Sequence, residues 1–383
     1  MPRHLIDVTR LLYGRMTGRL PTGIDRVGLE YIRHFGAGSR ALLAWRGLSA
    51  TLSPLDSARM FDLLLRPGAD VGAAFVAKAC ALGCASAGVG QCFLFNTGHY
   101  GLDHRGYAAL PRRRGARPVV VVHDLIPITH PQYCRRGERE RHLARMRNTL
   151  RMARGIVANS RHTLEDLKRF AAEARLPLPK AIVAPLAPAL PSAAPGPRPL
   201  EAPYFVMLGT IEPRKNHLLL LRVWRRLAAQ LGAAAPKLVV IGSRGWEYDE
   251  IVRQLADPAL GGSVLERGPR SDQEVVTALR HAQALLMPSH VEGYGLPVAE
   301  ALAAGVPVIA SELAVFRDIA GAVPDYAATD DEERWQALIL DYARPDSALR
   351  KAQLARLSGF RPTTWPQHFA AVEALLAELA AER

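Results

Sequence analysis

The stretch Pro288-Ser-His-Val-Glu-Gly-Tyr-Gly-Leu-Pro-Val-Ala-Glu300 decides the fold of this chain. It follows an apolar segment, residues 282–287, which is typical of a buried strand. Gly293 and Gly295 allow a tight turn that brings the backbone close to a ligand. Pro297 suits the first position of a helix, where a missing N–H group loses no partner. The sequence therefore predicts a strand, a tight turn and a helix whose first amides face the loop.

The same stretch predicts a binding site. The first amides of a helix bind phosphate or pyrophosphate, because they have no partners within the helix. Glu292 lies in the turn, and Glu300 follows in the first turn of the new helix, near enough to reach a sugar hydroxyl beside the phosphates. A buried strand followed by a helix with two solvated glutamates is the alternative. We prefer a nucleotide-sugar site, because the returning strand within Ala303-Ala-Gly-Val-Pro-Val-Ile-Ala310 completes the α/β pattern in order.

A second motif, Gly209-Thr-Ile-Glu-Pro-Arg-Lys-Asn216, follows a predicted strand and precedes a predicted helix over residues 216–230. Helix starts favour anions, so the adjacent cations Arg214 and Lys215 are locally unfavourable and indicate a function. Transfer from a nucleotide sugar expels a diphosphate on which negative charge grows. Two fixed cations over the ligand edge of the sheet would stabilise that transition state more than the ground state.

These motifs, together with His123-Asp-Leu-Ile-Pro-Ile-Thr-His-Pro131, resemble the retaining glycosyltransferases of family 4 (glycosyltransferase group 1). Within that family they are most similar to bacterial polysaccharide and O-antigen mannosyltransferases. Glu292 and Glu300 match the family's paired glutamates, which have seven residues between them. The resemblance covers nearly the whole chain, weakly in the first hundred residues and strongly after His123. It implies an α/β fold of the GT-B type, in which two Rossmann-like domains with parallel sheets face each other across a cleft.

The chain length predicts two domains. Residues 1–188 are expected to form an N-terminal, acceptor-binding Rossmann-like domain, and residues 203–362 a C-terminal, nucleotide-sugar-binding one. Residues 189–202 form the predicted linker, within a segment that has seven prolines between positions 185 and 203. The resemblance implies that residues 363–383 form a helix that returns to the first domain.

The resemblance also implies catalytic roles for His123, Arg214, Lys215 and Glu292. The ring or carbonyl of His123 would hold the sugar hydroxyl nearest the reacting carbon. Arg214 and Lys215 would bind the diphosphate, Glu292 the sugar hydroxyls and Glu300 the ribose. On this view Glu292→Gln or Lys215→Ala should remove most transfer and leave the melting temperature nearly unchanged.

Further donor and acceptor contacts follow from the same resemblance. Arg267 is expected near the base, which the family reads largely through backbone atoms. Gly23 and Arg26 correspond to a glycine-rich loop beside the diphosphate and acceptor, although this chain has fewer glycines there. Asn96 is expected in the acceptor groove, and Asp124 is expected to support its loop. The predicted donor-binding residues are Gly209, Gly242, Arg267, Gly293, Tyr294, Gly295, Leu296, Pro297, Val298 and Glu300.

The expected reaction is transfer of a hexose, with mannose from GDP-mannose as the specific candidate, to a lipid-linked or oligosaccharide acceptor. The product would be a surface polysaccharide such as lipopolysaccharide or capsule. We expect no cofactor and no metal, since the chain has no Asp-x-Asp cluster to ligate one. A GT-B nucleotide-sugar epimerase or a sugar phosphorylase is the alternative enzyme. A basic nucleic-acid-binding protein is the remote alternative.

Charge adds an expectation about the membrane. The net charge is +13, and residues 111–170 alone account for +10. A basic helix is predicted over residues 135–154, with Leu143, Met146 and Leu150 on one face. Three explanations stay open: a solvated helix packed on the sheet, contact with an anionic membrane, or nucleic acid, for which no recognised motif is present.

We expect a cytoplasmic enzyme, peripheral on the inner face of the bacterial inner membrane, because no secretory signal is visible. Residues 73–89 are weakly polar but consist mostly of Ala and Gly and include Lys78. We therefore predict a buried or partly buried helix there in place of a membrane span.

Overall fold

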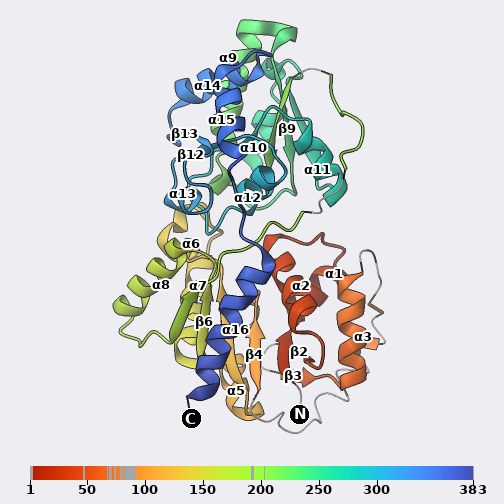
Figure 1. Cartoon of the computed structure of the whole chain (residues 1–383), viewed down its shortest axis with the longest axis vertical. Coiled ribbons are helices and arrows are strands. Elements are labelled where there is room, and N and C mark those ends of the chain that lie inside the picture. Colours follow the sequence, from red (N-terminus) through yellow and green to blue (C-terminus); the bar gives the residue numbers. More distant parts are fainter. Residues whose placement is uncertain are drawn as a thin grey trace. The chain divides into compact units, whose positions relative to one another are not determined.

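The computed structural model describes residues 3–45, 48–66, 68, 71–72, 75–77, 81, 92–190, 194–201 and 203–382. The chain divides into two units (Figure 1). The first unit comprises Met1–Ile128, Gly137–Leu186 and Trp365–Arg383, and the second comprises Thr129–Arg136 and Ala187–Thr364. The division differs from the expected one mainly at Thr129–Arg136, which lies within the range predicted for the first domain but groups with the second unit. Residues 187–188 and 363–364 also group with the second unit, so these two boundaries shift by two residues each.

A seven-stranded sheet forms the centre of the first unit, in the order β3-β2-β1-β4-β5-β6-β7. All neighbouring strands pair in parallel except β2 and β3. Only two residues separate β2 from β3, too few for a crossover, so the edge strand runs antiparallel. The strands are β1 His4–Asp7, β2 Arg40–Trp45, β3 Leu48–Thr51, β4 Phe93–Asn96, β5 Arg117–Val122, β6 Gly155–Ala158 and β7 Lys180–Val183.

Helices cover this sheet, and the unbroken apolar run of β5 is buried, as its sequence predicts. The basic helix forms as α7 over Glu138–Met152, a shorter span than expected. Met146 and Leu150 are buried in the core and Leu143 packs against it, so the predicted apolar face is confirmed. The final helix α16 packs on β6 and β7. The helices are α1 Thr9–Met16, α2 Gly23–Phe35, α3 Pro54–Leu65, α5 Arg105–Arg114, α6 Ile126–Thr129, α7 Glu138–Met152, α8 Arg161–Glu173 and α16 Trp365–Ala381.

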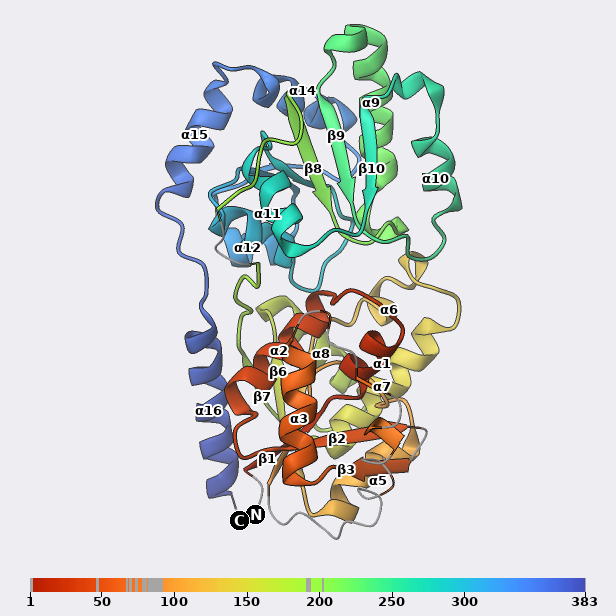
Figure 2. The same ribbon diagram turned by 90° about the vertical axis from the view of Figure 1, so that its right-hand side faces the viewer.

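A six-stranded sheet forms the centre of the second unit, in the order β10-β9-β8-β11-β12-β13, with every pair parallel. Figure 2 shows β8, β9 and β10 side by side. Strands β8 to β10 are added in one direction, and β11 then returns to the other side of β8. The strand order therefore reverses between β8 and β11. The strands are β8 Tyr204–Leu208, β9 Lys237–Ile241, β10 Val264–Gly268, β11 Leu285–Met287, β12 Val308–Ser311 and β13 Asp325–Ala327.

Two apolar layers sandwich the second sheet. Side chains alternate along β8: Phe205 and Met207 belong to the core shared with α9 and α14, whereas Tyr204 and Val206 face the core shared with α11 and α12. The helices are α9 His217–Leu231, α10 Asp249–Leu255, α11 Asp272–Arg280, α12 Leu296–Ala303, α13 Ala314–Ala320, α14 Glu332–Ala343 and α15 Ala348–Leu357. The predicted alternation of strands and helices is confirmed.

Two details near the site correct the sequence-based boundaries. Helix α12 begins at Leu296, so Pro297 occupies its second position, and Glu300 lies just beyond the first turn. The strand before the loop is limited to Leu285–Met287.

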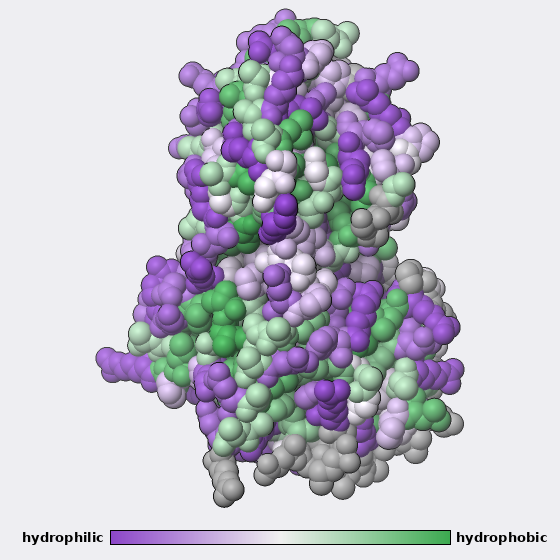
Figure 3. Space-filling model, viewed as in Figure 1, coloured by the Kyte–Doolittle hydropathy of each residue, from purple (hydrophilic) through white to green (hydrophobic). Residues whose placement is uncertain are grey.

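Most of residues 73–89 lies outside the described residues. Within the described part of the chain, no helix is long and apolar enough to cross a membrane. On the face shown in Figure 3, hydrophilic and hydrophobic residues are mixed on both units.

Candidate active site

The two motifs of the second unit meet where its strand order reverses. The loop after β8 contains residues 209–216, and the loop after β11 contains residues 288–295. The backbone N–H of His290 donates to the Arg214 carbonyl at 2.9 Å, and the Asn216 side chain donates to the Pro288 carbonyl at 3.1 Å. Doubly wound sheets bind ligands at this position, beyond the carboxyl ends of the strands.

A charge cluster of Glu212, Arg214, Lys215 and Glu292 lies at this junction. The Lys215 Nζ donates to Glu292 Oε1 at 2.5 Å, and the Arg214 Nη1 donates to Glu292 Oε2 at 2.6 Å. On its other side Arg214 donates from Nε and Nη2 to Glu212 Oε1, at 2.9 and 2.5 Å. The Ser289 hydroxyl completes the contacts of Glu292 at 2.8 Å. The predicted cation pair and the first glutamate therefore lie in direct contact.

Burial and charge act in opposite directions on the two carboxylates. Burial alone would raise the pKa of Glu292, but the charges of Arg214 and Lys215 and the hydrogen bonds from Lys215 and Ser289 lower it to about 2. Burial dominates for Glu212 and raises its pKa, against the same two cations. Glu292 is therefore ionised at neutral pH, and each of its two carboxylate oxygens contacts one of the two cations.

Glycines shape the turns around the cluster. A Cβ on Gly242, at the end of β9, would lie 1.9 Å from the Gly209 carbonyl oxygen, so neighbouring turns touch backbone to backbone. Gly295 has φ of +103°, and a Cβ there would lie 2.5 Å from the Phe316 ring. The demand for glycine at these two positions already arises from packing inside the unit. Close approach to a ligand is a separate property, which stays a prediction.

The other predicted donor residues lie on the same loop and helix or farther along the sheet. Tyr294, Val298 and Glu300 are buried at the start of α12. The Ala189 N–H donates to Glu300 Oε1 at 3.4 Å. Arg267, in contrast, is an exposed residue of the edge strand β10 and lines a separate hollow beside α11.

In the first unit, polar side chains gather at the carboxyl ends of β1, β4 and β5. Asn96 donates to the Tyr107 hydroxyl at 2.8 Å and to the Asp7 carboxylate at 3.4 Å. His123 is buried directly after β5, and its Nε2 lies 2.7 Å from the Thr97 carbonyl oxygen. Since a carbonyl only accepts, Nε2 carries the proton, and burial lowers the pKa of His123. The ring is therefore neutral, with its Nδ1 atom left as an acceptor.

Hydrogen bonds within the first unit already engage the backbone around His123. The His123 carbonyl accepts from the Asn159 side chain at 2.8 Å and from the Thr163 hydroxyl at 3.3 Å. Asp124 Oδ1 accepts from the Ile126 N–H at 3.1 Å, which closes the turn before α6.

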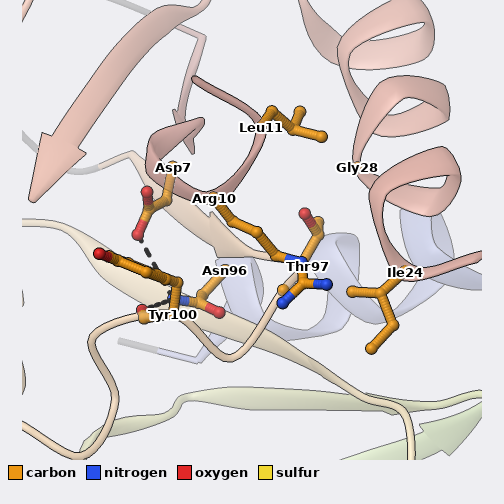
Figure 4. A pocket seen from close by; sticks show the side chains of 9 residues that line it. Asp7, Arg10, Leu11, Ile24, Gly28, Asn96, Thr97 and Tyr100 are labelled. Atoms are coloured by element: carbon orange, nitrogen blue, oxygen red, sulfur yellow. Dashed lines mark hydrogen bonds between the residues drawn. The ribbon is translucent and has the colours of Figure 1, made fainter. Parts of the chain in front are cut away.

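The prediction of a loop at Gly23 and Arg26 was wrong. Both residues belong to the first turn of α2, because Thr22 and Asp25 form a capping box that starts the helix there. Asp25 is buried and accepts from Arg10 Nε at 2.8 Å. Figure 4 shows Arg10 extending toward Thr97 in the small pocket that borders this helix.

Sequence reasoning missed an aromatic contact at the end of the His123–Pro131 motif. The Tyr133 ring stacks on His290 of the β11–α12 loop, with centroids 4.8 Å apart and planes 4° apart. The Trp246 indole donates to the Tyr133 carbonyl at 3.3 Å. The segment Thr129–Arg136 is thereby attached to the loop that holds Glu292.

Residues 192–338, which include both loops of the charge cluster, match the family of glycosyl transferases group 1. The second unit contains a group 1 glycosyltransferase domain. The described residues of the chain contain no group of three or more His, Cys, Asp or Glu side chains arranged to hold a metal ion.

The curated relatives that this chain matches are also named as glycosyltransferases. The serotype-specific mannosyltransferase WbdA of Escherichia coli is 29% identical over 261 residues, which cover 62% of this chain and 32% of WbdA. The O-antigen chain mannosyltransferase B of Escherichia coli is 30% identical over 162 residues, 42% of each chain. This chain therefore matches only about a third to two fifths of the length of these relatives.

Solved structures show the same fold beyond the group 1 domain. Anabaena HepE in complex with UDP and glucose superimposes with a TM-score of 0.69 at 13% identity, over 98% of this chain and 100% of that one. Sucrose-phosphate synthase from Thermosynechococcus elongatus gives a TM-score of 0.61 at 19% identity, over 81% and 78% of the two chains. The α/β fold that these structures share with this chain therefore extends beyond the group 1 domain to the first unit.

Glu212 and Ser289 are members of the site that sequence reasoning missed. Both lie inside motifs that were recognised, one beside the cations and the other three residues before Glu292. A signal for Glu212 was present, since two adjacent cations that become buried need more than one carboxylate between them. Burial of Arg214 and Lys215 was not predicted from the sequence, so the need for a second carboxylate was not recognised.

Proposed function

We propose that this chain is a retaining glycosyltransferase that moves a hexose from a nucleotide-diphosphate sugar to a lipid-linked glycan during surface polysaccharide synthesis. Mannose from GDP-mannose is the specific donor that we propose. The observation that supports transfer most strongly is the contact of Arg214 and Lys215 with Glu292 at the reversal of the strand order, inside the group 1 domain. The match to mannosyltransferases of O-antigen synthesis supports the choice of sugar.

In the proposed reaction, the bond between the anomeric carbon and the diphosphate oxygen breaks, and its electron pair stays on the diphosphate. The acceptor hydroxyl oxygen bonds to the same face of that carbon, and its proton passes to the departing diphosphate oxygen. Arg214 and Lys215 bind the growing negative charge, so no metal is needed in this scheme. Both cations are already held by carboxylates, which fixes their positions before the donor arrives.

Glu292 and Glu300 would bind the donor's hydroxyl groups, on the sugar and the ribose respectively. Glu292 suits this role because a carboxylate with a pKa of about 2 stays a pure acceptor at neutral pH. The neutral ring of His123 would hold a sugar hydroxyl through Nδ1, the ring atom that the Thr97 contact leaves as an acceptor.

The acceptor's lipid carrier would place the enzyme at the cytoplasmic face of the bacterial inner membrane. Helix α7 supports this part of the proposal, because its buried face anchors it to the sheet while Arg139, Arg147 and Arg151 are exposed. Exposed basic residues gain roughly 1 kcal/mol each beside anionic lipid.

Donor choice is tested by melting the purified chain with GDP-mannose, UDP-glucose, dTDP-glucose and ADP-glucose, since a ligand of the native state raises Tm. We expect the largest shift with GDP-mannose, and mannosyl transfer that persists in EDTA. A larger shift with UDP-glucose, which carries the nucleotide found in the HepE complex, would reject GDP-mannose as the donor. Activity that requires inorganic phosphate would identify a phosphorylase, and loss of activity in EDTA would reject the metal-free scheme.

A further inference from the structure

Three aromatic side chains cluster on the surface of the first unit. Tyr13 lies in α1, Trp45 ends β2, and Tyr100 follows β4. The Trp45 and Tyr100 ring centroids are 6.2 Å apart, and Tyr13 lies 6.5 Å from Trp45 and 6.4 Å from Tyr100. The planes of each pair are inclined by 30°, so the three rings form one aromatic cluster, here called the aromatic platform.

This platform borders a hollow of about 400 Å³. Trp45, Leu48 and Tyr100 contribute apolar surface, and Asp103, Arg141 and Arg145 are among its polar lining residues. Trp45 is 51% exposed and Leu48 is 74% exposed. A hollow of this volume, with apolar walls and a few polar groups, has the size and chemistry of a small-ligand site.

One polar group of the hollow, the guanidinium of Arg145, has unused hydrogen-bonding capacity. Glu138 binds Arg145 through Nη1 at 2.6 Å and Arg141 through Nη1 at 3.5 Å, which holds both arginines at the rim. The Nε of Arg145 is buried and has no hydrogen-bond partner among the described residues. A buried donor without a partner costs free energy, which a ligand oxygen would recover.

The hollow lies beside the ligand edge of the sheet. Tyr100 lines both this hollow and the pocket of Figure 4. Tyr107, a buried residue of the lining, donates its hydroxyl proton to Asp7 at 2.5 Å. The hollow thus lies at the carboxyl ends of β1, β2 and β4, where parallel sheets bind their ligands.

We propose that the aromatic platform of Tyr13, Trp45 and Tyr100 binds a hexose ring of the acceptor glycan, with Asp103, Arg141 and Arg145 contacting its hydroxyls. A pyranose ring has an apolar C–H face that fits an aromatic surface, and hydroxyls at its edge that both donate and accept. The hollow offers both kinds of partner, since Asp103 accepts and the arginines donate. A membrane surface would instead favour an apolar platform without an acidic residue in the depression. The inference rests on the proposed function for the identity of the glycan as acceptor.

The test measures binding of neutral oligosaccharides to the full chain, without donor, by saturation-transfer NMR and calorimetry. The probes are linear α-mannotetraose, maltotetraose and a rhamnose oligosaccharide, each at millimolar concentration. We expect at least one to bind the wild type, and Trp45→Ala to weaken that binding roughly tenfold through the loss of stacking. Trp45→Phe should keep most of the affinity because it keeps an aromatic face.

Leu55→Ala is the matched control, since Leu55 is an exposed apolar residue of α3 outside the hollow and should leave the affinity unchanged. Equal affinity of wild type and Trp45→Ala would overturn the proposal, as would the failure of every oligosaccharide to bind. Binding to phosphatidylglycerol vesicles that depends on Trp45, with no oligosaccharide binding, would overturn it in favour of a membrane contact.

The same samples separate this inference from the proposed function. GDP and UDP are titrated in parallel, since the nucleotide is expected on the second unit. Oligosaccharide binding that depends on Trp45, without any nucleotide binding, would support the platform and reject the transferase. If the chain binds nucleotide and transfers sugar to an acceptor, but Trp45→Ala does not change the KM for that acceptor, the transferase is supported and the platform is rejected.

Discussion

Replacing Glu292 by glutamine removes the one carboxylate that both cations of the charge cluster contact. A pKa of about 2 in place of the ordinary 4.5 corresponds to about 3 kcal/mol of stabilisation of the charged form. Breaking a buried ion pair by removing one partner costs a similar amount, about 3–5 kcal/mol. We therefore expect Glu292→Gln to lower the free energy of unfolding of the second unit by about 3 kcal/mol. The corresponding fall in Tm is about 6–12 °C.

A double-mutant cycle with Lys215→Met tests the origin of this loss. Each single variant breaks the contact between Lys215 and Glu292 and leaves the other group buried: Lys215 loses its carboxylate, and Glu292 keeps only Arg214 as a cation partner. The double variant removes both members of the Lys215–Glu292 pair. The double variant should therefore lose about 2 kcal/mol less free energy of unfolding than the sum of the two single losses. Urea unfolding followed by tryptophan fluorescence measures this, because Trp224 and Trp335 are buried in the core of the second unit.

The control is Glu266→Gln, which removes another arginine-bound glutamate of the same unit. Its bond to Arg244 is exposed, so the cost should stay below about 1 kcal/mol. Strictly additive costs at Glu292 and Lys215, or a Glu292→Gln variant as stable as the Glu266→Gln control, would refute the buried-cluster argument. The same geometry revises the sequence-based expectation that Glu292→Gln leaves the melting temperature nearly unchanged.

Three further predictions concern pH, packing and charge. Because the pKa of Glu292 is lower in the folded chain than its ordinary value, its contribution to stability is present above pH 4.5 and is lost as the pH falls toward 2. The Tm gap between wild type and Glu292→Gln should therefore close over that range, and a constant gap would contradict the assignment. Gly295→Ala should lower the free energy of unfolding in urea by at least about 2 kcal/mol, because of its positive φ and the clash with Phe316. Gly72→Ala is the control: a Cβ there meets open space, so the loss should stay under about 1 kcal/mol, and equal losses would reject the packing argument. Arg147→Glu, on the exposed side of α7, should weaken binding to phosphatidylglycerol vesicles at least about fivefold, and unchanged co-sedimentation would argue against a membrane contact at this helix.

The sequence predicted the second unit well because local and long-range signals agree there. Apolar runs end in glycine at Gly209 and Gly242, and both lie at the carboxyl edge of the sheet as expected. The capping box of Ser271 and Glu274 also forms where the sequence places it. In the first unit, the edge strand Leu48–Thr51 runs antiparallel and so departs from the expected parallel pattern.

Prediction of the site failed where burial decides the chemistry. Arg214 and Lys215 were predicted to bind the diphosphate, but the sequence does not show that the 3-10 turn Pro213–Lys215 buries the Lys215 side chain. Glu212 was overlooked for the same reason. At Gly23, the family resemblance suggested a glycine-rich loop, whereas the capping box of Thr22 and Asp25 starts a helix there.

The most direct test of the account compares nucleotide diphosphate and monophosphate binding in wild type and Lys215→Met, below the melting temperature of both. If the cluster binds the diphosphate, the variant should lose at least about tenfold in affinity for GDP or UDP and little for GMP or UMP. An equal loss for both nucleotide classes, or no loss for either, would contradict the claim that these two loops form the diphosphate site.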